Sequence, residues 1–481
     1  MAKQLVIPHV SRIEGHAKIT IDLDDSGNVV DARLHVTQLR GFEKFTEGRP
    51  YYEMPAITAR ICGICPVSHL LASVKACDQI LAVNIPTAAV RLRELLHFAQ
   101  FVQSHALSFF HLSAPDLLLG MDAAVGVRNV FGLARHFPDT ARDGIALRKF
   151  GQDTIERLAG QRIHPAWTVP GGVNRPLQST DRDAIRSGVP AALSIVNRAL
   201  ALVKGLLERF AEEAECFSNL ETRYAALVGV DGALQLYDGA LQFRSPSGDV
   251  LAEVTRPEAY VDYIGEAALL HSYLKAPYYK PDGANDGIYR VGPLARLNVC
   301  ERLGTELADR ELVEYRERLG RMPRSAFYGH YARLIEVLFC LEQIQRLIDN
   351  DDILSNHVRV HASVNAPRGV GIVEAPRGVL IHHYEVNGDG AITWANLIVA
   401  TGHNNLAMGR GVRQVAERFI RGGAVEEGLL NRVSAVVRAY DPCLSCSTHA
   451  AGQPALEIDV RRPDGSLHRR LRSVDPSLDG A

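Results

Sequence analysis

Four of the eight cysteines form two Cys-x-x-Cys pairs near opposite ends of the chain. Cys62 and Cys65 lie in the string RICGICPVSH, and Cys443 and Cys446 lie in DPCLSCSTH. A two-residue gap lets both sulfurs of a pair reach one metal ion, and thiolates are soft ligands that select Zn, Ni, Cu(I) or Fe–S clusters. The two pairs therefore predict metal chemistry at a site with four thiolates.

Spacing alone favours a structural zinc ion, because four-thiolate zinc sites are common. Zinc sites that stabilise small folds usually hold both pairs within a few tens of residues, whereas most of this chain separates Cys65 from Cys443. Zinc and a catalytic metal therefore both stay open at this point. The other cysteines are isolated, which is typical of buried apolar residues rather than ligands: Cys77, Cys216, Cys300 and Cys340.

Three charged strings accompany the cysteines: Ser11–His16, Arg40–Glu43 and Glu374–Gly378. Each by itself is equally consistent with a solvated edge. The string APRG also occurs at 366–369, so its recurrence at 375–378 carries little weight alone.

The segments that must position these residues include both strands and helices. Period-two alternation or hairpin turn residues predict strands and hairpins over 17–23, 29–36, 379–385, 391–399 and 455–474. Helical spacing of apolar residues predicts helices over 87–112, from Pro190 to Phe210, over 325–348 and over 424–440. Pro66 is well placed to start a helix directly after Cys65.

Composition excludes several classes of protein. The 481 residues are 47% hydrophobic and 22% charged with a net charge of −2, so the chain is not disordered, collagen-like or a coiled coil. No positive excess attracts nucleic acid or an anionic membrane, and no uninterrupted apolar run predicts a membrane span. Residues 1–10 lack the apolar core of a signal peptide, so we expect a cytoplasmic protein with reduced cysteines.

Taken together, the strings resemble the large, catalytic subunit of the nickel–iron hydrogenases, most closely the soluble, cytoplasmic, NAD-linked bidirectional group. The resemblance runs in order over nearly the whole chain, and the two cysteine pairs in these contexts are strongly specific. The matching strings are RIEGH at 12–16, RGFE at 40–43, RICGIC at 60–65, SH at 104–105, HP at 164–165, VPGGV at 169–173, EAPRG at 374–378 and DPC at 441–443.

The resemblance implies a mostly α fold with β elements (α+β), in which a long-helix bundle carries β hairpins from both chain ends. Residues 1–449 would form one catalytic body, comprising β-rich 1–40, helical 66–350, β-containing 358–400 and a metal-ligand part at 424–449. A maturation peptidase would remove Ala450–Ala481 once nickel is loaded, and the alternative is a C-terminal hairpin that stays.

The resemblance also implies a Ni–Fe(CN)2(CO) centre. All four thiolates would bind nickel, with Cys65 and Cys446 bridging to iron and Cys62 and Cys443 as terminal ligands. Dihydrogen is a very weak acid, so its cleavage needs Lewis-acidic metals and a nearby base. Cys443 would be that base and Glu14 would accept the proton next, while the alternative for Glu14 is an ion pair with Arg12.

Further residues take roles only through the resemblance. Arg377 would hold its guanidinium over the open metal position, near a cyanide, and the Thr401 hydroxyl would bind the other cyanide. His69 would donate to a bridging sulfur. Asp116 and Asp441 would surround the site and orient the arginine.

The resemblance implies a magnesium ion held by Glu43, His449 and the Leu397 carbonyl. Oxygen donors suit magnesium, and the histidine nitrogen is the unusual member of the set. The chain departs from many family members at Ala400–Asn404, where it has ATGHN rather than PTTWN. That change occurs in the soluble group and leaves the cyanide contacts open.

Sequence motifs for the electron acceptor are absent. The chain has no phosphate loop, and the glycines at 369 and 371 lack the third glycine of a dinucleotide fingerprint. Fe–S clusters, FMN and NAD are therefore expected only in partners: a diaphorase module and an Fe–S small subunit. Maturation would need the endopeptidase and metal-insertion proteins.

Two other functions remain as alternatives. One is a soluble hydrogenase with a different acceptor, of the methyl-viologen-reducing or F420-linked type. The other is a non-catalytic, metal-stapled subunit of a redox complex, such as the related quinone-site subunit of respiratory complex I, which lacks the four cysteines. A zinc scaffold would leave Arg377, Glu14 and the tail without a role.

Overall fold

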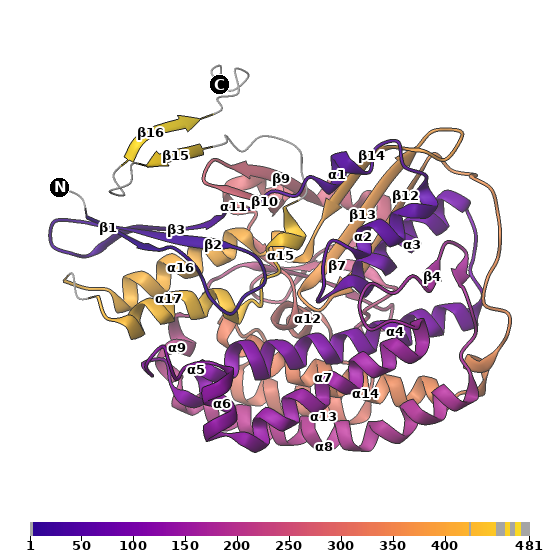
Figure 1. Ribbon diagram of the computed structural model, residues 1–481, viewed down its shortest axis with the longest axis horizontal. Helices are drawn as coiled ribbons and strands as arrows, with labels where there is room; N and C mark the ends of the chain where they lie inside the picture. The colour runs from indigo at the N-terminus through magenta and orange to yellow at the C-terminus, as the bar shows by residue number, and fades with distance from the viewer. Residues whose placement is uncertain (1–2, 423–424, 449–456, 462–466, 473–481) are drawn as a thin grey trace.

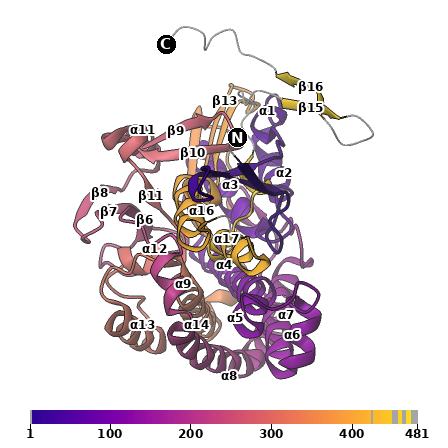
Figure 2. The ribbon, with the colours of Figure 1, turned by 90° about the vertical axis from the view of Figure 1, so that its left-hand side faces the viewer.

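The computed structural model describes residues 3–422, 425–448, 457–461 and 467–472. A bundle of long helices forms one side of the molecule, and a three-stranded sheet packed against helix α3 (Pro66–Leu81) forms the other (Figure 1). The perpendicular view of Figure 2 again places the bundle at one end and most of the sheets at the other. The predicted α+β class is confirmed.

The bundle is built from α4 (Thr87–Ala106), α7 (Pro138–Ala159), α8 (Ser179–Arg209), α13 (Glu306–Leu319) and α14 (Gly329–Ile348). Helix α4 packs against both α7 and α14. Its Leu92, Leu95 and Leu96 are fully buried, and each such side chain stabilises the fold by roughly 1.5–3 kcal/mol. The helix predicted over 87–112 begins at Thr87 as expected, but its last part, Leu107–Ser113, is a π-helix (η2).

Helix α8 differs from the prediction because it begins at Ser179 and contains Pro190 in its interior. A proline normally disfavours a helix interior, but here the buried side chains Ile185 and Val189 attach the preceding turns to the bundle. By length and composition α8 is the one described helix that could cross a membrane. In the structure it packs against α14 and α7.

Two antiparallel sheets come from the predicted strands. β2 (Ala17–Leu23) and β3 (Val29–Val36) have the predicted bounds, and β1 (Lys3–Ile7) extends their sheet. The second sheet contains β12 (Arg368–Ala375), β13 (Gly378–Val386) and β14 (Ile392–Ile398) in that order. The register pairs Ala375 with Gly378, so the β12–β13 turn consists of Pro376 and Arg377 alone.

The middle of the chain is not uniformly helical, and this corrects the helical boundaries expected for 66–350. A four-stranded sheet has the order β11-β6-β7-β8, and β9 and β10 form a separate hairpin. The strands are β4 (Thr168–Val169), β5 (Gly172–Val173), β6 (Arg223–Val228), β7 (Ala240–Arg244), β8 (Val250–Val254), β9 (Ile264–Leu269), β10 (Ser272–Tyr279) and β11 (Tyr289–Arg290). Strand β6 is buried on both faces from Tyr224 to Val228, so it lacks the alternation by which a half-exposed strand is recognised.

The remaining helices connect these layers. They are α1 (Phe42–Phe45), α2 (Met54–Ala59), α5 (Ala114–Leu119), α6 (Val130–His136), α9 (Ala211–Cys216), α10 (Tyr260–Tyr263), α11 (Gly283–Asp286), α12 (Pro293–Val299), α15 (Ala400–His403), α16 (Asn405–Phe419) and α17 (Glu427–Ala439). The helix predicted over 424–440 corresponds to α17, and its first predicted residue, 424, lies outside the described residues.

Beyond residue 448, β15 (Glu457–Arg461) and β16 (Leu467–Arg472) pair antiparallel, which confirms the predicted C-terminal hairpin. In both views this hairpin stands apart from the bundle and the central sheets (Figures 1 and 2).

Candidate metal centre

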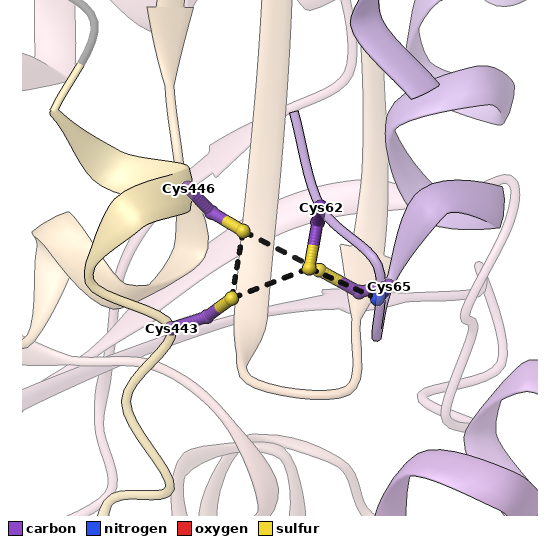
Figure 3. A group of neighbouring side chains, drawn as sticks. All are labelled: Cys62, Cys65, Cys443 and Cys446. Carbon is purple, nitrogen blue, oxygen red and sulfur yellow. Dashed lines mark hydrogen bonds between the residues drawn. The ribbon is translucent and has the colours of Figure 1, made fainter. Parts of the chain in front are cut away.

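The four cysteines meet in one place, although their two pairs come from opposite ends of the chain. Cys62 and Cys65 lie in the turn between α2 and α3, and Cys443 and Cys446 follow α17. Their sulfur atoms all lie within 4.8 Å of one another, and Figure 3 shows the side chains pointing towards a common centre. None of the four is more than 4% exposed, and no disulfide joins them.

Local structure explains how each pair presents two sulfurs. Pro66 starts α3, as predicted, and the backbone N–H groups of Ile64 and Cys65 both donate to Cys62 Sγ at 3.2 Å. The Cys443 and Cys446 sulfurs are 2.6 Å apart, and Cys443 Sγ is 3.4 Å from Cys62 Sγ. The start of α3 thus holds the first pair of cysteines, and the second pair lies against the first pair.

The surroundings shift the pKa values of Cys62, Cys443 and Cys446 in different directions. Burial opposes ionisation of Cys62, but hydrogen bonds from Cys443, Cys446 and Cys65 and the charge of Arg377 outweigh it and hold its pKa well below the ordinary value. Burial raises the pKa of both Cys443 and Cys446 well above the ordinary value. Thiolate is the form that binds metal, and within this group the surroundings favour ionisation of Cys62 over that of Cys443 and Cys446.

Arg377 projects from the β12–β13 turn towards this group. Its Nε donates to the Asp441 carbonyl at 2.6 Å, its Nη2 lies 3.1 Å from Asp441 Oδ1, and its Nη1 donates to Ser104 Oγ at 3.3 Å. Burial alone would lower the pKa of this guanidinium, but the charge of Asp441 and of the nearby cysteines raises it well above the ordinary value. A permanent positive charge is thus held, 3% exposed, beside the sulfurs.

Glu14 reaches the same group from the N-terminal segment. Its carboxylate lies 3.1 Å from Cys443 Sγ and accepts the Ser445 backbone N–H at 3.1 Å and the Ser445 hydroxyl. A backbone bridge between Glu14 and Cys443, with Leu444 N–H donating to Glu14 O at 3.0 Å, fixes this approach. Cys443 Sγ is therefore held within hydrogen-bond distance of Glu14 Oε2.

Gly15 permits this approach, and its replacement by alanine should disrupt it. Its φ is +87°, and an added Cβ would lie 2.8 Å from both Leu444 Cβ and Ser445 N. We expect Gly15→Ala to lower thermal stability by more than the roughly 1–3 kcal/mol of a left-handed non-glycine residue, and to reduce nickel retention. Gly48→Ala is the matched control, because Gly48 has a φ of +80° with open space around its Cα. Equal losses in the two variants would contradict this packing argument.

Strained backbone gathers at the same place. Five described non-glycine residues have a left-handed φ, and three of them are Arg12, His164 and Asp441. Arg12 and Asp441 lie two residues before Glu14 and Cys443, and His164 Nε2 donates to the Cys62 carbonyl at 2.9 Å. Such strain commonly marks functional sites, where surrounding contacts must offset it.

Thr401 and His69 both lie beside the cysteines. Thr401 Oγ1 accepts the Cys443 backbone N–H at 2.9 Å. In this structure its hydroxyl oxygen therefore holds the backbone of Cys443, a predicted metal ligand. His69 Nδ1 is 3.1 Å from His382 Nε2, and His382 in turn contacts the Tyr384 hydroxyl at 2.6 Å. Burial lowers the pKa of His69 to about 4, and its buried Nε2 has no hydrogen-bond partner among the described residues.

Asp116 differs from the expectation that it orients Arg377. Its carboxylate contacts Arg12 Nη2 at 2.5 Å, Arg438 Nε at 2.9 Å and Arg128 Nε at 3.4 Å. The expectation is wrong in its partner, because the π-helix η2 and α5 direct Asp116 towards α17 and the N-terminal segment. The alternative role given to Glu14, an ion pair with Arg12, is also wrong, because Arg12 pairs with Asp116 instead.

The candidate magnesium ligands are brought together only in part. Glu43 Oε1 accepts the Leu397 backbone N–H at 2.9 Å, and Lys275 Nζ lies 3.8 Å from the same carboxylate. Burial raises the pKa of Glu43, although Lys275 opposes this. His449 lies outside the described residues, whereas the preceding Thr448 carbonyl accepts the Arg40 N–H at 2.8 Å.

Sequence reasoning assigned no role to several residues that contact the site. The only sequence signal for Ser104 and His164 was that each lies in a string that matches the hydrogenase family. His382 and Lys275 lie on strands with no chemical motif around them, so nothing local to the sequence could have singled them out.

The chemistry of the donor set fits a soft metal ion. Four buried cysteine sulfurs suit nickel as well as zinc. A closed structural zinc site, however, has no need of a buried guanidinium and a carboxylate at its ligands, and here Arg377 and Glu14 occupy those positions.

Comparison with known proteins shows which family contains this arrangement. A family model described as nickel-dependent hydrogenase matches residues 40–126 and 245–449, which is more than half of the chain and includes all four cysteines. The chain belongs to the nickel-dependent hydrogenase family. A second model, described as HoxL-like, matches residues 4–39 of this hydrogenase subunit.

Individual relatives cover nearly all of the hydrogenase subunit. It is 40% identical to the NAD-reducing hydrogenase HoxS subunit beta of Cupriavidus necator, over 97% of this chain and 99% of that protein. It is 43% identical to the vhu subunit of the F420-non-reducing hydrogenase of Methanocaldococcus jannaschii, over 86% of this chain and 99% of that one. A solved NAD+-reducing [NiFe]-hydrogenase in the H2-reduced state superposes with a TM-score of 0.91 and 46% identity, covering 93% of this chain and 99% of that one.

Proposed function

We propose that this hydrogenase subunit cleaves H2 reversibly and heterolytically at a nickel–iron centre held by Cys62, Cys65, Cys443 and Cys446. The observation that carries the proposal is the convergence of four buried sulfurs within 4.8 Å, with the Arg377 guanidinium and the Glu14 carboxylate directed at them. On the family resemblance, Cys65 and Cys446 would hold an iron, with its cyanide and carbon monoxide ligands, as well as the nickel. When bound, this group supplies the Lewis-acidic metals and the redox capacity that cleavage of H2 requires.

The protein's own groups account for the movement of the proton. Cys443 Sγ would take the proton released from H2, and Glu14 Oε2 lies 3.1 Å from that sulfur to accept it next. Ser445 keeps the carboxylate in this orientation through its backbone N–H and its hydroxyl. The short donor–acceptor distance meets the geometric requirement for general base catalysis.

Arg377 serves as a fixed positive charge, and Asp441 and Ser104 hold its orientation. Burial of the guanidinium strengthens its effect on nearby negative charge, because a water-excluded site screens charges weakly. His69 would adjust the electronic properties of a bridging sulfur through a hydrogen bond, and the Thr401 hydroxyl would hydrogen-bond a cyanide. The orphaned Nε2 of His69 supports such a contact.

A magnesium ion at Glu43, Leu397 and His449 is also part of the proposal, supported by the contact between Glu43 and Leu397. We further propose that residues 1–449 form the mature body and that 450–481 are removed on maturation. The family match ends at residue 449, which supports this boundary. Mass spectrometry of the subunit from its native complex tests it, and an intact C-terminus in nickel-loaded protein would refute it.

The electrons would leave through an Fe–S small subunit, then pass through a flavin-containing diaphorase module to NAD, in the cytoplasm. The similarity to the two NAD-reducing hydrogenases supports this acceptor. A different acceptor is the second candidate, favoured by the 43% identity to a subunit of an F420-non-reducing hydrogenase. Assays of H2-dependent reduction of NAD+ and of a viologen dye by the purified complex distinguish the two, since activity with the dye alone would exclude NAD.

Infrared spectroscopy of the processed protein with its native partners tests the metal centre. We expect bands from iron-bound carbon monoxide and cyanide, because these diatomic ligands absorb where protein does not. A processed protein without such bands, with one zinc ion per four thiolates, would instead establish a zinc scaffold.

A further inference from the structure

A buried ion network centred on Arg296 of α12 lies directly behind Arg377. Arg296 Nε and Nη2 donate to the two oxygens of Glu336 at 2.6 and 2.7 Å, and Nη1 donates to Glu374 Oε2 at 2.7 Å. The side chains of all three residues are fully buried. The network therefore joins α12, α14 and β12 in the interior.

The same guanidinium also holds the backbone of the β12–β13 turn. Arg296 Nη1 donates to the Ala375 carbonyl and Nη2 donates to the Pro376 carbonyl, each at 2.9 Å. These are the two residues immediately before Arg377. All five N–H donors of Arg296 are thus used: three on carboxylates, one on the last residue of β12 and one on the turn.

We propose that Arg296 is a positioning residue that holds the β12–β13 turn so that Arg377 faces the four cysteines. This inference rests on the proposed function, because it concerns the placement of a charge beside the metal centre. Arg377 itself is held at its far end by Asp441 and Ser104. Arg296 supplies the anchor at its base.

The physical cost of the network supports a positioning role. Burying an arginine and two carboxylates carries a desolvation penalty that their mutual attraction offsets only with good geometry, and apolar residues of similar volume are often at least as stabilising. A planar guanidinium is suited to this task because it can bind two carboxylates and two carbonyls in fixed directions. A lysine ammonium at this position has three donors and no fork.

A second connection ties the network to the other side of Arg377. His105 Nε2 is 2.7 Å from Glu336 Oε2, and its neighbour on α4, Ser104, accepts from Arg377 Nη1. Ser104 thus holds the guanidinium of Arg377 directly. His105, the next residue of α4, holds the backbone before Arg377 indirectly, through Glu336 and Arg296.

Arg296→Lys tests the role in the processed complex purified with its native partners. We expect nickel content per protein to stay near wild type, H2 turnover per bound nickel to fall by about 10- to 100-fold, as a displacement of about 1 Å produces, and the infrared bands of iron-bound carbon monoxide and cyanide to shift. The bands respond to charge beside these ligands, so a displaced Arg377 moves them. Bands at wild-type positions with turnover within about twofold of wild type would overturn the proposal.

Arg93→Lys is the matched control. Arg93 is also fully buried, pairs with Asp78 at 2.6 Å and donates to the carbonyls of Val169 and Gly172. It lies eleven residues before Ser104 on α4, or about 16 Å along the helix. We expect it to lower the melting temperature while leaving the bands and the turnover per nickel unchanged, whereas band shifts equal to those of Arg296→Lys would overturn the positioning role.

Glu336→Gln keeps the proposal testable if Arg296→Lys does not accumulate. The amide retains an acceptor for Arg296 but loses the charge that pairs with its fork, so we expect a band shift in the presence of bound nickel. Unshifted bands in this variant would overturn the role of Arg296. Absence of bands from the wild-type complex would instead overturn the proposed function, and the inference with it.

Discussion

Replacing Cys443 by serine is expected to abolish nickel retention and H2 turnover. Four thiolates bind a metal ion with roughly 10–16 kcal/mol, so one of them represents about 3 kcal/mol, or a loss of at least about 100-fold in affinity. A serine hydroxyl does not ionise in this pH range and is a hard donor, so it does not replace the sulfur. Cys443 Sγ also lies 3.1 Å from Glu14 Oε2, the proposed proton acceptor. Metal analysis together with H2-dependent dye reduction measures both losses.

Cys216→Ser is the matched control for this variant. Cys216 is buried, and its sulfur donates to the Glu212 carbonyl at 3.3 Å, a contact that a serine hydroxyl can also make. We expect wild-type nickel content and turnover in this variant. Normal nickel content and turnover in Cys443→Ser would remove Cys443 from the metal centre.

Replacing Glu14 by glutamine is expected to separate metal binding from proton transfer. The amide oxygen can still accept from Ser445, so the segment should stay in place and nickel should be retained. The amide cannot take the Cys443 proton, and loss of a general base lowers rates by about 100- to 10,000-fold. Exchange between H2 and deuterated water, measured by mass spectrometry, should therefore fall by that factor while the infrared bands remain.

Glu47→Gln controls for the loss of one carboxylate. Glu47 is exposed and pairs with Lys44 at 2.5 Å, away from the cysteines, so we expect no change in exchange. Full exchange activity in Glu14→Gln would exclude Glu14 from the proton path. Loss of nickel in that variant would show that Glu14 is needed to hold the metal-ligand segment.

Much of the local structure follows from patterns within the sequence. Alternating apolar residues set the bounds of β2 and β3, and the turn signal at 387–390 lies between β13 and β14. Pro66 marks the start of α3. These features depend on contacts between residues close in the chain or on one face of one element, and both leave a periodic pattern.

Other elements have no such pattern. Strand β6 is buried on both faces, so its composition does not distinguish it from a buried helix, and the sheet around it was not predicted. Helix α8 continues through Pro190 because Ile185 and Val189 bury the turn before it. In both cases burial against distant segments outweighs the local preference.

The chemistry of the site was determined by the sequence, because residue type and a two-residue spacing suffice to identify four soft sulfur ligands in two pairs. Their arrangement was decided by the tertiary structure. Only folding brings Cys62 to within 3.4 Å of Cys443, pairs Asp116 with Arg12 rather than Arg377, and places Arg296 against the turn that carries Arg377. Spacing describes neighbours a few residues apart, whereas these contacts join residues that lie 80 to 381 positions apart and depend on how the bundle and the sheets pack.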